Sequence, residues 1–305
     1  MIAVLAAMAA STAAGLAIHA RSPALGPRVA TLALRAILWV VYPFVVVFSL
    51  PHLHADGHLA IGLLLGYGVA ALAGCAAWLI GSRVLQLSRA GTGTLICGAV
   101  IMNTGYFGLP FVGALLGRSH LTEAVAFDSL VSGPLFYVAG FAIGAAFGAH
   151  RDLAGRARVR QLVLRNPPLL AAVAGLLLPA SASPRVLTDL AHHAVWVLLV
   201  LGFVALGATL AAEADEGALA FPPRLDGQVG AAVALRIVAA PALYLGATAL
   251  LGGAPPGFRV EEAMPIGINL LVVSHAAGLD LRVAAAAITW STVAVAAWGL
   301  VVSVT

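Results

Sequence analysis

Charged side chains are scarce in this chain of 305 residues. Only 9% of the residues are charged, whereas 62% are hydrophobic. A soluble domain of this length needs a far more polar surface, so the composition excludes a large soluble domain. Cysteine is also scarce, and Cys75 and Cys97 both lie in apolar segments. Their positions indicate neither a disulfide framework nor a paired-cysteine metal site, and they are typical of small buried residues.

Lysine is absent, and the sixteen Lys or Arg positions are all arginine. Basic chains often bind nucleic acid, but this one has no long basic face and no patch of mixed basic and aromatic residues. We therefore expect no nucleic-acid partner. The arginines lie mostly in short joints between apolar runs of roughly 20 residues, the length that a helix needs to cross a bilayer. The pattern predicts an all-α, multi-pass membrane protein.

The apolar runs predict ten transmembrane helices. Their ranges are 2–20, 29–50, 59–81, 92–116, 123–148, 167–180, 190–211, 228–251, 262–278 and 282–303. The first run has no basic segment before it and nine spans after it, so we interpret it as a mature helix and not as a signal sequence. Most joints are short. The joint at 150–166 is rich in arginine and is predicted to be an amphipathic linker on the cytoplasmic membrane surface.

The arginines also predict the orientation of the chain. With ten spans, the joints alternate between two sides of the membrane. One side has only Arg118, Arg185 and Arg259, whereas the other has Arg21, Arg28, Arg35, Arg83, Arg89, Arg151, Arg156, Arg158, Arg160, Arg165, Arg224 and Arg282. Cytoplasmic loops carry an excess of arginine, so the richer side is predicted to be cytoplasmic. Both termini are then expected outside the plasma or inner membrane.

The linker divides the chain into two halves of five predicted helices, residues 1–149 and 167–305. Since five is odd, any repeat that relates the halves must have inverted topology. The fourth span of each half is interrupted, by "NTGYFGLP" at 103–110 and by "MPIGIN" at 264–269. Both interruptions contain proline, glycine and asparagine near the middle of the span. Matched interruptions of this kind indicate the binding site of a transporter.

Proline and glycine give these segments a reason to leave helical geometry. Pro110 lacks a backbone donor and clashes with the carbonyl near Tyr106, while Gly105 and Gly108 permit non-helical backbone or a close approach. The freed backbone groups must then face a ligand or a water-filled cavity, where two half-helix N-termini favour an anion. The predicted substrate site consists of Asn103, Thr104, Gly105, Tyr106, Gly108, Pro110, Pro265, Gly267, Asn269, Ser274 and His275. A proline kink without a binding role is the alternative.

The two interruptions also resemble motifs of a known family. "MNTGYFGLPFVGALLG" resembles the Asn-x-Gly-(aromatic)-x-Gly-x-Pro signature of the auxin efflux carrier family, and "AMPIGINLLVVSHAAGLD" resembles its Pro-x-x-x-Asn stretch. Weaker matches follow the family order, in "LWVVYPFVVVFSL", "RNPPLLAAVAGLLLP" and "LGFVALGATL". The resemblance covers nearly the whole chain. It places the sequence beside small bacterial carriers related to the plant PIN-type auxin exporters.

The resemblance implies a fold and a function. The fold is two inverted five-helix repeats in the bile-acid-symporter-like arrangement, with helices 4 and 9 broken and crossing. Helices 1, 2, 6 and 7 form a scaffold, and helices 3–5 and 8–10 form a transport domain that moves against it. The implied function is export of small organic anions such as auxin, malate or malonate by alternating access. A proton gradient or the membrane potential drives it, and a homodimer forms through the scaffold.

The sequence departs from the family at two points. His275 stands in "HAAG", where relatives often carry an Ala-x-x-Tyr-Gly ending. No carboxylate is predicted at the crossover, although sodium-coupled relatives of this fold have acidic or amide ligands there. This counts against sodium coupling, and a sodium-coupled symporter of the same fold remains an alternative.

Two charged residues inside predicted spans are candidates for coupling or gating. Asp128 lies about one turn inside the outer end of the fifth span, with Ser132 and Tyr137 following it towards the midplane. An acid within the membrane is a functional candidate by default, and a solvated helix end is the competing interpretation. Arg236 lies about two turns inside the eighth span. We favour a side chain that snorkels to the interface over one that binds a substrate carboxylate.

The histidines are weaker candidates. His275 is interpreted as a neutral residue packed between helices, with a proton-sensitive cavity residue as the alternative. His52, His54 and His58 lie with Asp56 in an outer joint, but their spacing fits no metal site. The pair His192–His193 fits none either. We therefore expect no metal and no cofactor.

An intramembrane enzyme and a channel are the alternatives to a transporter. An intramembrane enzyme acting on a lipid-like substrate needs clustered acids or a nucleophile beside a base. The acid run that we considered, 213–216, lies in a cytoplasmic joint without a neighbouring histidine or cysteine. A channel would lack the opposed broken helices, and no nucleotide-binding motif is present. The sequence therefore predicts a transporter and not an enzyme.

Overall fold

The computed structural model describes residues 1–54, 56–149, 166–215 and 223–304, and within these ranges it is helical without strands. Seven of its helices are long and apolar enough to cross a membrane. They are Ile2–Arg21, Leu25–His52, Gly57–Val84, Arg118–Phe147, Arg185–Asp215, Gly227–Leu250 and Leu281–Val302. The chain is thus an all-α protein with the helices of a multi-pass membrane protein, as predicted. The predicted linker at 150–166 lies, except for Asn166, outside the described residues.

The described residues of the first half form eight α-helices. They are α1 (Ile2–Arg21), α2 (Leu25–Ala36), α3 (Tyr42–Ser49), α4 (Gly57–Leu79), α5 (Arg89–Val100), α6 (Leu109–Leu115), α7 (Leu121–Phe127) and α8 (Phe141–Phe147). In the second half are α10 (Pro167–Leu177), α11 (Arg185–Asp215), α12 (Gly227–Ala234), α13 (Ala240–Leu250), α14 (Pro256–Glu262), α15 (Asn269–Ala277) and α16 (Leu281–Val304). Three predicted spans are therefore not long helices: 92–116 and 262–278 are each divided, and 167–180 contains only the short α10.

Wide turns of π-helix join several of these pieces into longer helices. In the described part of the chain, four of them end two residues before a proline. They are η1 (Ile37–Val41) before Pro43, η4 (Thr104–Gly108) before Pro110, η6 (Asp128–Ser132) before Pro134 and η10 (Leu235–Ala239) before Pro241. A proline cannot donate to the carbonyl four residues earlier and its ring crowds that carbonyl. In the wider turn, the backbone hydrogen bonds just before the proline join residues five apart instead of four, so the helix continues past the proline.

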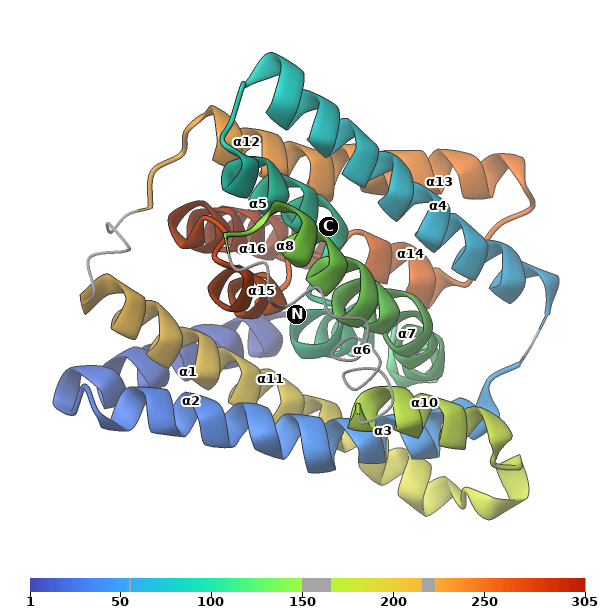
Figure 1. Cartoon of the computed structure of the whole chain (residues 1–305). Coiled ribbons are helices and arrows are strands. Elements are labelled where there is room, and N and C mark those ends of the chain that lie inside the picture. Colours follow the sequence, from blue (N-terminus) through green and yellow to red (C-terminus); the bar gives the residue numbers. More distant parts are fainter. Residues whose placement is uncertain (55, 150–165, 216–222, 305) are drawn as a thin grey trace.

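The helices form two groups with a third set between them (Figure 1). Helices α1, α2, α3, α10 and α11 pack together along one side, and α4 packs beside α13 on the opposite side. The broken helices and α8 and α16 lie between these sides. The backbones of α1 and α11 approach closely at Gly15. A Cβ added there would lie 2.8 Å from the Ala208 nitrogen, so a larger side chain would not fit. Small residues permit such contacts between membrane helices.

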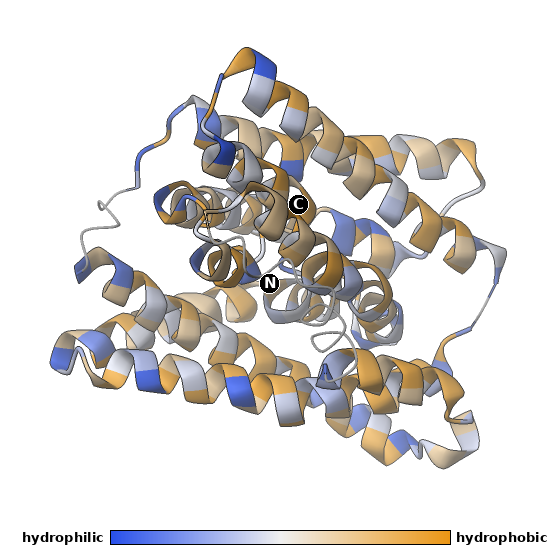
Figure 2. Cartoon of the chain, in the orientation of Figure 1, coloured by the Kyte–Doolittle hydropathy of each residue, from blue (hydrophilic) through white to orange (hydrophobic). Residues whose placement is uncertain are grey.

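The outer surface of the helices is apolar. Leu64, Leu177 and Leu250 expose 73%, 78% and 87% of their surface. Figure 2 shows hydrophobic residues along every long helix and hydrophilic residues mostly near the helix ends. Contiguous apolar surface of this extent is rare on soluble proteins, and it fits contact with lipid chains. The polar groups of the broken segments lie inside, away from this surface.

Candidate functional site

The two predicted interruptions lie side by side. Helix α5 ends at Val100 and α14 ends at Glu262, and after each of them the backbone leaves helical geometry. Met102 and Ile266 form an antiparallel bridge. The Asn103 amide donates to the Pro265 carbonyl at 2.8 Å, and the Gly267 amide donates to the Ile101 carbonyl at 2.9 Å. The prediction that the two interrupted spans each contain non-helical backbone and lie close together is confirmed.

The position and the backbone bonding of the first break differ from the prediction. The non-helical residues are 101–103, well before Pro110, which lies in the first turn of α6. The π turn η4 accommodates this proline, and therefore Pro110 does not break the helix. We also expected the freed backbone groups to face a cavity or a ligand. Several of them pair across the crossover instead, which satisfies them without water.

Two glycines permit this close packing. A Cβ added to Gly267 would lie 2.6 Å from the Met102 carbonyl oxygen, so only glycine allows the two backbones to pair. A Cβ added to Gly108 would overlap the carboxyl group of Glu261. These residues, together with Pro265, shape the crossover through their backbones and do not line the cavity beside it.

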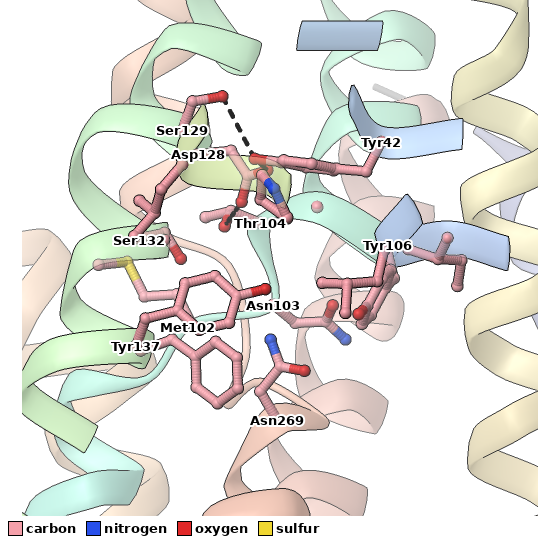
Figure 3. A pocket seen from close by; sticks show the side chains of 17 residues that line it. Tyr42, Met102, Asn103, Thr104, Tyr106, Asp128, Ser129, Ser132, Tyr137 and Asn269 are labelled. Atoms are coloured by element: carbon pink, nitrogen blue, oxygen red, sulfur yellow. Dashed lines mark hydrogen bonds between the residues drawn. The ribbon is translucent and has the colours of Figure 1, made fainter. Parts of the chain in front are cut away.

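Two helices begin at the crossover, and their N-termini face the same space. The continuous helix Thr104–Leu115 starts directly after Asn103, and α15 starts at Asn269. Figure 3 shows the two asparagine side chains extending from the two segments towards each other. The Asn103 side chain is 3% exposed, and its amide nitrogen and oxygen have no hydrogen-bond partner. A buried amide without partners is costly, and a bound ligand would satisfy it.

A cavity of about 50 Å³ adjoins the crossover and is partly open to solvent. This is room for a few water-sized groups, and it is smaller than a typical small-molecule site. Its lining residues are Ile37, Leu38, Tyr42, Met102, Asn103, Thr104, Gly105, Tyr106, Asp128, Ser129, Ser132, Gly133, Phe136, Tyr137, Pro168, Leu169 and Asn269. We refer to it as the crossover pocket. Because α3 and α10 contribute from the group that contains α1 and α11, and η4, η6 and α15 belong to the broken helices, the pocket lies where that group meets the broken helices.

Asp128 is the carboxyl group of this pocket. It is 6% exposed, so it is not a solvated helix end. The Tyr42 hydroxyl donates to its Oδ2 atom at 2.5 Å, and the Thr104 hydroxyl donates to its Oδ1 atom. Ser129 Oγ lies 3.2 Å from the Tyr42 hydroxyl oxygen (Figure 3). The expectation that no carboxylate lies at the crossover is therefore wrong, because the fifth span folds back against the broken fourth one.

The structure brings together only part of the predicted site. Asn103, Thr104, Gly105, Tyr106 and Asn269 line the crossover pocket. The pocket lining does not include Gly108, Pro110, Pro265, Gly267, Ser274 or His275.

The last two of these residues lie too far along α15 to reach the pocket. Ser274 is fully buried. The His275 side chain is 74% exposed and 3.9 Å from Glu213, so it is neither packed between helices nor part of the cavity.

Arg236 fits neither of its predicted roles. Its side chain is fully buried, so it does not snorkel, and it does not line the crossover pocket. Its Nη2 atom lies 2.6 Å from Glu262 Oε1 in an ion pair that is buried on both sides. The partner lies on α14, far away in the sequence, and a reading of the eighth span alone could not identify it.

Several polar residues of the centre were missed. Tyr42 and Ser129 lie beside Asp128, and Glu261 and Glu262 end α14. Both carboxyl oxygens of Glu261 are buried without a partner. A signal for the two glutamates existed, because they form an adjacent acidic pair just before Met264, whereas we considered only the run at 213–216. Among the outer histidines, the Nε2 atom of His52 lies 2.9 Å from the Ser183 carbonyl oxygen. Within the described residues, no three metal-ligating side chains cluster.

The crossover pocket thus combines two helix N-termini, two side-chain amides and one carboxyl group. Among the described residues, its lining includes no arginine, lysine or histidine. Hydroxyl groups of tyrosine, serine and threonine supply the remaining polar atoms. Such a site can bind a small polar molecule, and it can hold or release a proton at Asp128. Compared with known proteins, the chain matches no protein-family model and no curated protein.

Proposed function

We propose that the protein is a secondary transporter of small organic acids that binds its substrate in the crossover pocket. The buried side-chain amide of Asn103 carries this proposal, because its nitrogen and its oxygen both lack a partner at the start of a broken helix. Buried polar groups are nearly always hydrogen-bonded. An exception that lines a cavity between α3, α10 and the broken helices is best explained by a ligand that binds there.

The arrangement of the helices supports alternating access. The divided segments α5–α6 and α14–α15, together with α10, supplement the seven long helices, and we count them as ten spans in two inverted repeats. On this reading α1, α2, α3, α10 and α11 form the scaffold, and the remaining helices form the transport domain. A pocket lined by both parts is what such a motion needs, since it opens and closes when one part moves against the other.

The charges of the pocket favour an acid that is transported together with a proton. The N-termini of Thr104–Leu115 and Asn269–Ala277 favour a bound carboxylate. The ionised Asp128 side chain would repel that carboxylate, and a proton on Asp128 removes the repulsion. Binding of the anion is then tied to binding of the proton. The direction of transport follows the two gradients, and export remains our expectation from the family resemblance.

Transport by the purified protein in proteoliposomes tests the proposal. Uptake of labelled malonate, malate and indole-3-acetate is measured with imposed pH, sodium and voltage gradients in turn. We expect at least one acid to move, and faster when protons enter with it. Asn103→Ala should raise the apparent KM about tenfold or more, since a hydrogen bond to a charged group is lost. Asn103→Asp keeps the size of the side chain but adds a negative charge, and should abolish binding of the anion.

Ser82→Ala is the control, because Ser82 is partly exposed, its hydroxyl donates to the Trp78 carbonyl and it lies outside the pocket. Its transport should equal that of the unchanged protein. If no acid moves under any gradient, or if Asn103→Ala leaves the apparent KM unchanged, the proposed site is wrong.

A further inference from the structure

Arg236 is the largest fully buried side chain in the described structure, and it lies outside the crossover pocket. We propose that its guanidinium group is a tethered cation at the C-terminal ends of the two broken half-helices, in a site that takes a free monovalent cation when Arg236 is removed. The cation site rests on the geometry alone. Its consequence for transport, independence from sodium, rests on the proposed function.

The guanidinium group binds both half-helix ends at once. Nη1 donates to the carbonyl oxygen of Ala99, in the last turn of α5, at 3.4 Å. Nη2 donates to the carbonyl oxygen of Glu262, the last residue of α14, and to Glu262 Oε1 at 2.6 Å. One side chain therefore joins two segments that stand far apart in the sequence.

Electrostatics explains why a cation is needed there. The last four carbonyls of a helix have no partner within the helix, and its C-terminus carries a partial negative charge. Two such ends meet at this point, and the Glu262 carboxylate adds a full charge. Without a cation, this group of oxygens would be strongly destabilised away from water. In transporters with broken helices, the half-helix C-termini are where a coupling cation binds.

The bonding pattern distinguishes this site from an ordinary buried salt bridge. An arginine devoted to a carboxylate commonly binds it with two parallel hydrogen bonds. Here Oε2 of Glu262 and Nε of Arg236 have no partner, and the guanidinium divides its donors between one carboxylate oxygen and two backbone carbonyls. It coordinates three oxygens from two half-helices, much as a metal ion would.

Removal of Arg236 should leave a cavity lined by these oxygens. Carboxylate and carbonyl oxygens suit hard cations, so sodium or another small monovalent ion is the ligand class. The prediction is a gain of function in cation binding, which loss of a merely structural ion pair would not produce.

Thermal unfolding of the purified protein in detergent tests the site without any transport. The unchanged protein, Arg236→Ala, Arg236→Gln and Arg236→Lys are compared in sodium chloride and choline chloride at equal ionic strength. We expect the unchanged protein and Arg236→Lys to melt at the same temperature in both salts. Arg236→Ala should melt lower in choline chloride and regain about 2–5 °C in 100 mM sodium chloride. Arg236→Gln, whose amide replaces the lost donors without charge, should fold and show a smaller sodium effect.

Arg236→Ala combined with Glu262→Gln is the matched control, because it removes the carboxylate ligand and should lose the response to sodium. Sodium stabilisation of the unchanged protein would overturn the proposal, and so would identical melting of Arg236→Ala and Arg236→Gln in the two salts. If Arg236→Ala is not recovered folded in either salt, Arg236→Gln decides.

Uptake of the labelled acids separates this inference from the proposed function. The unchanged protein should transport equally well in sodium and in choline, whereas Arg236→Gln should transport faster in sodium. If no variant transports but sodium still stabilises Arg236→Ala, the cation site stands and the proposed function fails. If the unchanged protein transports and sodium affects no variant, the proposed function stands and the cation site fails.

Discussion

At the scale of single residues, the centre of the protein is defined by polar side chains with unusual partners. Asp128 accepts hydrogen bonds from Tyr42 and Thr104, while the side-chain amide of Asn103 has no partner in the described structure. The Asp128 carboxyl group finds its hydrogen-bond partners within the protein, whereas the Asn103 side-chain amide does not. This difference separates a residue suited to hold a proton from a residue suited to hold a substrate.

Asp128→Asn tests the proton-binding role. The amide keeps the size of the carboxyl group, and the hydroxyl groups of Tyr42 and Thr104 can still bond to it, but it cannot carry the proton. For one proton per substrate, a gradient of one pH unit gives about tenfold accumulation. We expect this accumulation in the unchanged protein and none in Asp128→Asn, measured as labelled substrate in proteoliposomes.

Tyr42→Phe is the control, since it removes one donor and keeps the acid. It should retain the response to pH. The other ionisable groups near Asp128 are Tyr106, Tyr137 and Glu261, and all of them stay in place in both variants. A normal pH response in Asp128→Asn would assign the proton to another of these groups.

At the scale of secondary-structure elements, the backbone pairing between the two broken segments is decisive. The antiparallel bridge of Met102 and Ile266 satisfies groups that each helix gave up by ending early. Neither segment can be unwound alone at low cost, because unpaired backbone in the membrane interior is unfavourable. The two breaks therefore depend on each other.

Gly267→Ala tests this dependence. The added Cβ would lie 2.6 Å from the Met102 carbonyl oxygen, so the pairing must shift. We expect a loss of about 1–3 kcal/mol in the free energy of unfolding, measured by thermal or denaturant unfolding in detergent. Gly230→Ala is the matched control, because no atom lies within 4 Å of its added Cβ and it sits inside α12. It should be neutral or stabilising by up to about 1 kcal/mol. Equal stability of the two variants would show that the pairing tolerates a side chain.

At the scale of the whole molecule, the pocket lies where one group of helices meets the broken helices. This group contains the closely packed pair α1 and α11 (Figure 1). Its helices α3 and α10 line the pocket together with η4, η6 and α15. A rigid movement of this group relative to the broken helices would change access to the pocket without unfolding any helix. The homodimer through the scaffold stays a prediction.

Labelling of single cysteines tests the ten-span orientation. In a chain with Cys75 and Cys97 replaced by alanine, Ser119→Cys stands in a predicted outer joint and Arg224→Cys in a predicted inner one. Both positions are exposed. A membrane-impermeant maleimide added to whole cells should label Ser119→Cys and not Arg224→Cys, and both should react after the cells are opened. The reverse pattern would invert the orientation, and labelling of both from outside would refute the span count.

The sequence by itself determined the helical class, most of the long apolar spans and the two spans that are interrupted, although not the exact position of the first break. These features depend on local chemistry, since span length follows from bilayer thickness and glycine permits the non-helical backbone at an interruption. Only the tertiary structure decided which polar groups meet. Tyr42 reaches Asp128 across 86 positions and Arg236 reaches Ala99 across 137, and no local pattern encodes such distances. The crossover pocket and the contacts of the Arg236 guanidinium form because helices from both halves of the chain pack together.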